Sequence, residues 1–247
     1  MSRTYDCADL EERATGIREA AYAVRRGELI VLPTDTVYGI GADAFSPLAV
    51  SELLRAKRRG RDMPPPVLVG TPKAATALIE DLGPDGQNLM DAFWPGALTV
   101  ICRANRSLAW DLGDTKGTVA VRMPDHEIAI ELLKQTGPLA VSSANLTGND
   151  AASTAAEAET QLGDAVELYL DAGPVSGGVP STIIDLTGAV PRVVRAGGIS
   201  TDRLREVAAT IQTDADTDAD QTDADAGQAD TSQADTGQAD TGQANTG

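Results

Sequence analysis

The chain has 247 residues, 42% of them hydrophobic, and a formal net charge of −17 at pH 7. It can bury a substantial core, and it contains no apolar run near the 18 residues that a membrane-spanning helix needs. Two distant cysteines and a single histidine exclude a disulfide framework and a zinc centre, so we assign no metal-ligating residue and expect a cytoplasmic protein. The acidity also argues against broad nucleic-acid binding.

In chain order, the hydrophobic pattern predicts a helix over 10–26, a strand over 28–33 and a helix over 48–58. Strands over 67–69, 97–102 and 118–122 follow, then a helix over 125–135 and a strand over 139–142. The last elements are a helix over 154–162, strands over 166–170, 182–186 and 190–195, and a helix over 201–210. This alternation predicts an α/β domain around one twisted, mixed sheet, although periodicity does not give the strand order.

The final segment, from Thr213 to Gly247, contains nine Asp, no Lys and no Arg, and repeats a short unit of small and polar residues. It cannot bury enough apolar area to offset the entropy of ordering, so we predict a disordered acidic low-complexity tail over 213–247 and one folded domain over 1–212. Without this tail 28 acids face 20 bases, and only four bases are lysines. Such a surface favours salt adaptation over ordinary sequence drift.

The standard signatures of nucleotide binding and nucleophilic hydrolysis are missing. No GxxxxGK[ST] loop occurs, and Gly39-Ile-Gly41 lacks the third glycine of the dinucleotide fingerprint. No GxSxG occurs either, and His126 has no obvious triad partner in the sequence. These absences leave three other segments as candidates for chemistry.

Each of the three segments follows a predicted strand or helix and has two interpretations. Residues 33–39, PTDTVYG, are either a capped turn or the polar end of an α/β cleft. Residues 57–61, KRRGR, are either a solvated helix end or a polyphosphate site, and the acidity elsewhere favours the phosphate site. Residues 141–148, VSSANLTG, either form a turn or point Ser143 and Asn145 into the same cleft.

Taken together, seven ordered segments resemble the YrdC-like threonylcarbamoyl-AMP synthases. They are PTDTVYGIGADA, the KxR bases within KRR, FWPGALTV, TVAVRMPDH, SSANLTG, GVPSTIIDL and PRVVRAGGI. The resemblance runs from about Gly27 to Gly198. The resemblance implies a YrdC-like twisted mixed β-sheet flanked by helices, with an open substrate cleft, in the single-domain form.

The resemblance also implies an L-threonylcarbamoyladenylate synthase, a nucleotidyltransferase that converts ATP, L-threonine and bicarbonate or CO2 into threonylcarbamoyl-AMP and pyrophosphate. Mg²⁺ would accompany ATP, and a threonylcarbamoyl-transferase complex would then modify tRNA. Weak double-stranded RNA binding is part of the same expectation. The alternative is an RNA-binding paralogue of the same fold without synthase activity, which the KxR and SxN pairs disfavour. A carbamoyl-transfer module of the hydrogenase-maturation type would need cysteines that the chain lacks.

Matching positions imply the following roles. The expected catalytic residues are Lys57, Arg59, Ser143 and Asn145. The expected ATP contacts are Lys57, Arg59, Met63, Thr118, Asn145, Ser153 and Arg195. The expected threonine contacts are Thr36, Arg122, Ser143 and Ser181. Two positions depart from the family pattern: Leu68 stands where many members have histidine, which removes or replaces a threonine contact, and Gly60 replaces a proline, which would loosen its loop.

Overall fold

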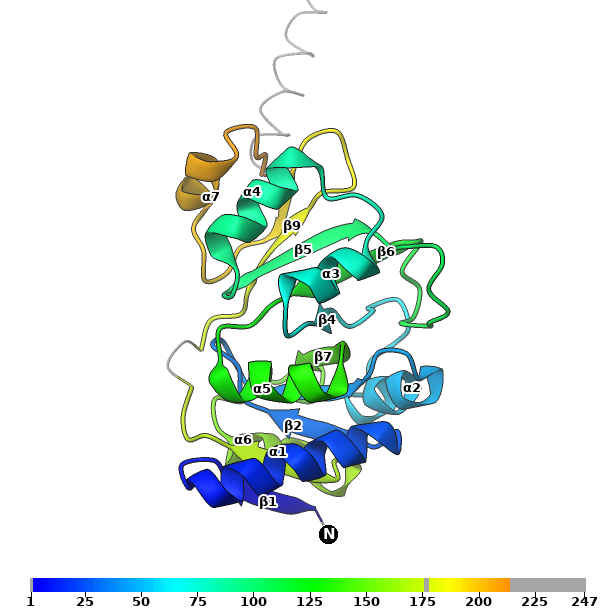
Figure 1. The fold of residues 1–247 in the computed structure, drawn as a ribbon, viewed down its shortest axis with the longest axis vertical. Coiled ribbons are helices and arrows are strands. Elements are labelled where there is room, and N and C mark those ends of the chain that lie inside the picture. Colours follow the sequence, from blue (N-terminus) through cyan, green and yellow to red (C-terminus); the bar gives the residue numbers. More distant parts are fainter. Residues whose placement is uncertain (1, 176–177, 214–247) are drawn as a thin grey trace, which may run out of the picture. The chain divides into compact units, whose positions relative to one another are not determined.

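Ten strands of the described residues, which are 2–175 and 178–213 of this computed structural model, form one mixed sheet (Figure 1). In sheet order they are β1 (Arg3–Asp6), β8 (Leu168–Asp171), β2 (Ile30–Leu32), β3 (Gly39–Asp43), β7 (Leu139–Ser143), β4 (Val67–Leu68), β6 (Thr118–Arg122), β5 (Leu98–Arg103), β9 (Thr182–Asp185) and β10 (Arg192–Arg195). The pairs β1–β8, β2–β8, β4–β6 and β5–β9 are parallel. The other neighbours are antiparallel, so the predicted mixed sheet is confirmed.

Helices flank this sheet, as predicted. They are α1 (Leu10–Arg25), α2 (Pro47–Ala56), α3 (Pro72–Leu78), α4 (Gly83–Phe93), α5 (Glu127–Thr136), α6 (Ala155–Leu162) and α7 (Thr201–Val207), and a 3-10 turn covers Gly163–Ala165. Most of these helices begin at a residue whose side chain caps the N-terminus. The carboxylate of Asp9 accepts from two backbone N–H groups of α1, and Ser46 caps α2, whose first residue is Pro47. No helix of the described part of the chain is both long and apolar enough to cross a lipid bilayer.

The half of the sheet nearest β1 is covered by helices on both faces. Successive side chains of a strand point to opposite faces, so Ile30 and Leu32 pack with α1 and α5, while Leu29 and Val31 pack with α2 and α6. Figure 1 shows α1 and α5 side by side, and Arg13 of α1 forms ion pairs with Glu127 and Glu131 at α5. This half is therefore a three-layer sandwich with little room for a ligand.

The other half of the sheet is covered differently on its two faces. Leu98 and Val100 of β5 pack under α3, α4 and α7 in one apolar core. The alternate residues of the same strand, Thr99 and Ile101, face a cavity on the opposite side. Loops over 59–66 and 112–115 complete the wall of that cavity. The fold thus reserves one face of β5, β6 and β9 for a site.

Four elements were not predicted, and each has a physical reason. Strand β1 is polar and largely exposed at the sheet edge, and β3 contains Gly39 and Gly41, which suggested a turn. A Cβ on Gly39 would lie 2.6 Å from Val141 Cγ1, so packing against β7 requires the glycine. Helix α3 is short, and α4 begins with the poor helix formers Gly-Pro-Asp-Gly. The other predicted elements are shifted by at most three residues.

Residues 1–212 form one compact unit. The predicted acidic tail lies outside the described residues, except for Thr213.

Candidate functional site

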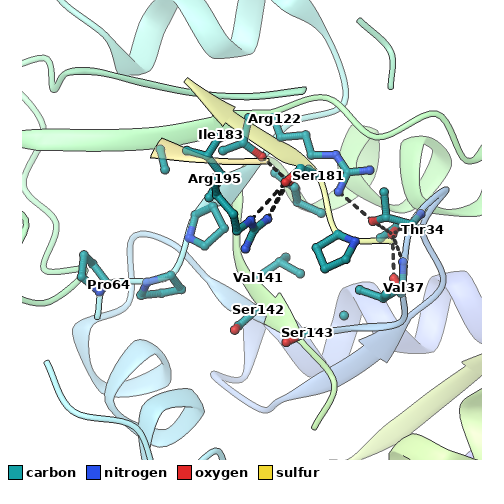
Figure 2. Close-up of a pocket in the computed structure, with 18 of the residues that line it drawn as sticks. Thr34, Val37, Pro64, Arg122, Val141, Ser142, Ser143, Ser181, Ile183 and Arg195 are labelled. Carbon is teal, nitrogen blue, oxygen red and sulfur yellow. Dashed lines mark hydrogen bonds between the residues drawn. The ribbon is translucent and has the colours of Figure 1, made fainter. Parts of the chain in front are cut away.

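A cavity of about 310 Å³ lies at the carboxyl ends of β2 and β7 and over the open face of β5, β6 and β9. Figure 2 shows Arg195 and Ser181 on one side of it, with Ser142 and Ser143 across the open space. The turn after β2 and the loop after α2 supply further wall, so segments far apart in the sequence meet here. The three candidate segments therefore converge on one site.

The 33–39 segment is both a capped turn and part of the cavity. The Thr34 hydroxyl donates to Val37 O at 2.6 Å and accepts from the backbone N–H groups of Thr36 and Val37 at 3.2 and 3.3 Å. Thr34 and Thr36 are buried, and both line the cavity. The segment is therefore a capped turn and also a polar part of the cleft, because the turn fixes the positions of the Thr34 and Thr36 hydroxyls.

Arg122 has a buried guanidinium, and only some of its N–H groups are hydrogen-bonded within the described residues. Its Nε donates to Gly96 O at 2.9 Å, Nη1 donates to Thr36 Oγ1 at 2.9 Å, and Nη2 donates to Asp35 Oδ1 at 2.5 Å. Burial lowers the pKa of Arg122, and the Asp35 carboxylate opposes that shift. Arginine has five N–H donors, so one on each terminal nitrogen is left without a bond in the described residues. A carboxylate can accept both of them in a bidentate pair.

Arg59 and Arg195 supply positive charge that no carboxylate neutralises directly. Among the described residues, neither forms an ion pair, and the buried Nε of Arg59 has no hydrogen-bond partner. Burial lowers the pKa of both guanidiniums, and the charge of Arg59 lowers that of Arg195 further, whereas Asp62 raises that of Arg59. Two desolvated cations in one cavity form a strong site for an anion.

Hydrogen bonds to Ser181 fix the orientation of the Arg195 side chain. Its Nε and Nη2 donate to Ser181 O at 3.1 and 2.7 Å, and Nη2 also lies 3.1 Å from Ser181 Oγ (Figure 2). The Ser181 hydroxyl in turn shares a 2.7 Å hydrogen bond with Thr99 Oγ1. The guanidinium and the hydroxyl are therefore fixed before any ligand arrives.

The loop that carries Arg59 is tied across the cavity mouth. Arg61 Nη2 donates to Asp111 Oδ1 at 2.8 Å, and Arg61 O accepts from the backbone N–H of Asp114 at 2.8 Å. Further along the same loop, Pro64, Pro65 and Pro66 line the cavity wall. Gly60 lies in this same loop, which is held at Arg61.

The cavity brings together seven of the eleven predicted site residues. Those that line it are Thr36, Arg59, Thr118, Arg122, Ser143, Ser181 and Arg195. Met63 is 39% exposed in the loop, and the Ser153 hydroxyl donates to Glu157 at 2.9 Å. Lys57 and Asn145 are buried behind the lining and contact one another.

Lys57 lies apart from the position that its expected role suggests. Its side chain is fully buried, and Nζ donates to the backbone of Ser143 and Asn145 rather than facing the cavity. Burial, aided by the charge of Arg59, lowers the pKa of Lys57 to about 8, so the group is still mainly protonated at neutral pH. Because the folded pKa lies below the ordinary 10.5, the unfolded chain binds this proton more tightly, and this group makes stability rise with pH between about 8 and 10.5.

Sequence reasoning missed three contributors to the site. Asp35 holds Arg122 and also accepts from the backbone N–H of Asp125 at 3.0 Å, and Thr34 and Thr99 orient their neighbours. The signal for Asp35 was its place between two threonines after a buried strand. Leu68, the departure from the family pattern, pairs in register with Arg122 and gives the cavity an apolar wall there.

Gly197→Ala should disturb the site through the backbone. A Cβ at this position would lie 2.4 Å from Pro180 O and 2.5 Å from Ser181 C, and neither atom can rotate away. We expect a loss of about 1–3 kcal/mol in the free energy of unfolding, together with reduced ligand binding because Ser181 must move.

Gly188→Ala is the matched control, since its nearest neighbour is 3.7 Å away. Thermal unfolding of both variants measures the difference, and equal unfolding temperatures would contradict this account of the close contact.

The family described as "Telomere recombination", with the name Sua5/YciO/YrdC, matches residues 22–197. A Mycobacterium tuberculosis protein with the provisional name threonylcarbamoyl-AMP synthase is 54% identical over 207 residues, which are 84% of this chain and 95% of that protein. The threonylcarbamoyl-AMP synthase of Bacillus subtilis is 37% identical over 205 residues, covering 80% of this chain and 58% of that protein.

Among solved structures, Pyrococcus abyssi Sua5 complexed with L-threonine matches with a TM-score of 0.80 and 31% identity. The match covers 86% of this chain and 62% of that chain. Escherichia coli YciO has a TM-score of 0.71 at 24% identity, covering 83% of this chain and all of its own, which shows the shared fold.

Proposed function

This chain belongs to the Sua5/YciO/YrdC family, and from that premise we propose a threonylcarbamoyl-AMP synthase whose active site is the cavity described above. One observation carries the proposal. The cavity holds one guanidinium, that of Arg122, with two N–H groups unbonded in the described residues. It also holds two further guanidiniums, those of Arg59 and Arg195, which form no ion pair with a carboxylate of the described residues. These features match a substrate with one carboxylate and a second substrate with a polyphosphate.

The carboxylate end of the cavity suits L-threonine. The two remaining N–H groups of Arg122 would donate to the threonine carboxylate, with Thr36, Ser143 and Ser181 as hydroxyl contacts around it. The Pyrococcus abyssi relative was solved with L-threonine, which supports this placement. Leu68 and Val141 add apolar wall near Arg122 that the threonine methyl group could contact.

The phosphate end suits ATP. Arg59 and Arg195 would hold the phosphates, and Thr118 also lines the cavity. Asn145 would contribute through the 143–145 turn, while Met63 and Ser153 would approach the nucleotide from the loops around the cavity mouth. No Asp or Glu of the described residues lines the cavity, so the Mg²⁺ of the ATP substrate would be held by phosphate oxygens and water.

The reaction needs charge neutralisation more than it needs an added nucleophile. The threonine amine and bicarbonate would form a carbamate with loss of water, or the amine and CO2 would form it with loss of a proton. A carbamate oxygen then attacks the α-phosphorus of ATP, the new P–O bond forms, and the bond to pyrophosphate breaks. Both partners are anionic, so Arg59 and Arg195 would stabilise the developing charge, and fixed hydroxyls would hold the geometry.

The decisive experiment is pyrophosphate release from ATP by the purified chain. We expect release to require both L-threonine and bicarbonate, with threonylcarbamoyl-AMP as the second product by mass spectrometry. Pyrophosphate release that ignores either omission, or no release at all from the folded protein, would overturn the proposal.

The synthase reaction should need only residues 1–212. The compact unit and every proposed contact lie within that range, and the family match ends at residue 197. We expect a chain truncated after Gln212 to keep its rate of pyrophosphate release within about twofold, since the removed residues supply none of the proposed contacts. Titration of ATP into both chains is the check, and a folded truncation that no longer binds ATP would contradict the domain boundary.

We place the reaction in the cytoplasm, where its product would pass to a complex that transfers the threonylcarbamoyl group to tRNA. Direct RNA contact is a separate expectation, and a gel-shift titration with tRNA at two salt concentrations tests it.

A further inference from the structure

The Lys57 side chain ends inside the loop over 143–149 and not in the cavity. We propose that Lys57 is a positioning residue: its ammonium fixes the backbone turn over 143–145, which places Ser143 at the cavity, and it makes no contact with the ATP phosphates. The inference rests on the proposed function, because it concerns the site of that reaction.

The first support is that the ammonium has no donor left to give. Nζ donates to Ser143 O at 2.5 Å, to Asn145 O at 2.6 Å and to Asn145 Oδ1 at 3.4 Å. A lysine ammonium has three N–H groups, and the side chain is only 2% exposed. A phosphate could reach Nζ only by displacing at least one of these oxygens.

The second support is that the loop is attached to Lys57 at both ends of the residue. The backbone oxygen of Lys57 accepts from Thr147 N at 3.0 Å and from Thr147 Oγ1 at 2.8 Å. The Asn145 side-chain amide closes the loop further by donating to Leu146 O at 3.0 Å and to Asn149 O at 2.7 Å. The 143–149 loop is thus wrapped around Lys57. Its other hydrogen bonds among the described residues include Ala144 N to Tyr38 O at 2.8 Å and Leu146 N to Gln161 Oε1 at 3.1 Å.

The third support explains the spacing of the two bases. Lys57 is the C-cap of α2, and Arg58 has a φ of 54°, which turns the chain sharply before Arg59. Arg59 then lies on the cavity side, where Nη1 donates to Ser142 Oγ at 3.0 Å. Lys57 therefore holds the end of β7 from behind, while Arg59 contacts it from the cavity.

Nuclear magnetic resonance of the unaltered chain tests the proposal without a substitution. The chain has only four lysines, and Lys73, Lys116 and Lys134 are exposed. With ¹⁵N-labelled lysine, we expect one slowly exchanging ammonium signal in the ligand-free protein, still present after α,β-methylene-ATP is added. An ammonium that is unprotected in the free protein and becomes protected only with nucleotide would overturn the proposal.

Hydrogen exchange of the ligand-free variants gives a second test. In Lys57→Met, the backbone N–H groups of Ala144 and Thr147 should exchange at least about tenfold faster, because a charged donor to two buried carbonyls is lost. Arg59→Met should leave that exchange unchanged although it abolishes most pyrophosphate release. Arg55→Met is the control, since Arg55 is exposed and its one ion pair within the described part of the chain is with Glu52.

The kinetic result should agree. Lys57→Met should raise the KM for threonine and the KM for ATP together. The turn that Lys57 holds contains Ser143, a proposed threonine contact, and Asn145, which would contribute to the ATP site. A Lys57→Met protein with normal exchange over 144–149 and a raised KM for ATP alone would show a direct phosphate contact and sink the proposal. The hydrogen-exchange comparison and the ligand-free ammonium spectrum are recorded without nucleotide, so absence of synthase activity in the unaltered chain would overturn the function and leave this role standing.

Discussion

Arg59→Ala should slow pyrophosphate release by roughly 10²-fold or more, the cost of removing one preorganised donor from a charged transition state. The substitution should hardly change the stability of the fold. The guanidinium donates one hydrogen bond, to Ser142 Oγ, and its Nε is already without a partner in the described residues. What the substitution removes is an unneutralised charge in the cavity, so the loss should fall on the reaction of an anionic substrate.

The measurement pairs kinetics with thermal unfolding. Arg58→Ala is the matched control, because Arg58 is an exposed neighbour of equal charge that does not line the cavity. An exposed charge contributes about 1 kcal/mol or less, so this control should retain nearly the full rate. Arg59→Lys should recover part of the lost rate, since it restores the charge without the planar fork. If a folded Arg59→Ala protein releases pyrophosphate at the unaltered rate, the assignment of the phosphate site to this cavity is wrong.

Arg122→Lys should raise the KM for L-threonine by roughly 10²-fold and leave the KM for ATP nearly unchanged, because lysine cannot form the bidentate pair with a carboxylate. Lysine keeps a positive charge beside Asp35. Arg122→Ala is a poorer test: it leaves a mostly buried carboxylate unpaired, which costs about 3–5 kcal/mol of stability. The lysine variant separates substrate recognition from folding.

A substrate analogue sharpens this second test. L-threonine methyl ester keeps the amine and the hydroxyl but lacks the negative carboxylate. The unaltered chain should strongly prefer threonine to the ester, and Arg122→Lys should lose most of that preference. Asp35→Asn, which retains an oxygen for Arg122 Nη2, should give an intermediate result. If Arg122→Lys affects threonine and ATP equally, the carboxylate does not bind at Arg122.

The elements that hydrophobic periodicity predicted are those whose apolar residues face a core. Helix α5 was found because Ile128, Leu132 and Leu133 bury one face. Helix α4 was missed because its first residues are Gly, Pro and Asp. A Cβ on Gly86 would lie 2.8 Å from Leu82 Cγ, just before the helix, and 2.9 Å from Leu186 Cδ1. A contact between segments 100 residues apart leaves no local signal.

The candidate site could likewise be predicted only in part from the sequence. The residue types for binding a carboxylate and a phosphate could be recognised in the sequence, and Arg59, Arg122 and Arg195 do line one cavity. The direction of each side chain could not be predicted. Lys57 and Arg59 read as one basic cluster until the left-handed backbone of Arg58 separates their side chains. Asp35 was overlooked because its role depends on a partner 87 positions away.

The division of β5, β6 and β9 between two faces has a consequence for engineering. Residues that line the cavity alternate along these strands with residues that pack under the helices, so substrate preference and thermal stability are encoded at different positions of the same strands. Ile101, Ala120 and Ile183 could be varied in a library while Leu98, Val121 and Ile184 stay fixed. A screen for amino acids other than threonine should therefore yield a high fraction of folded variants, and the same number of changes on the helix-covered face should yield few.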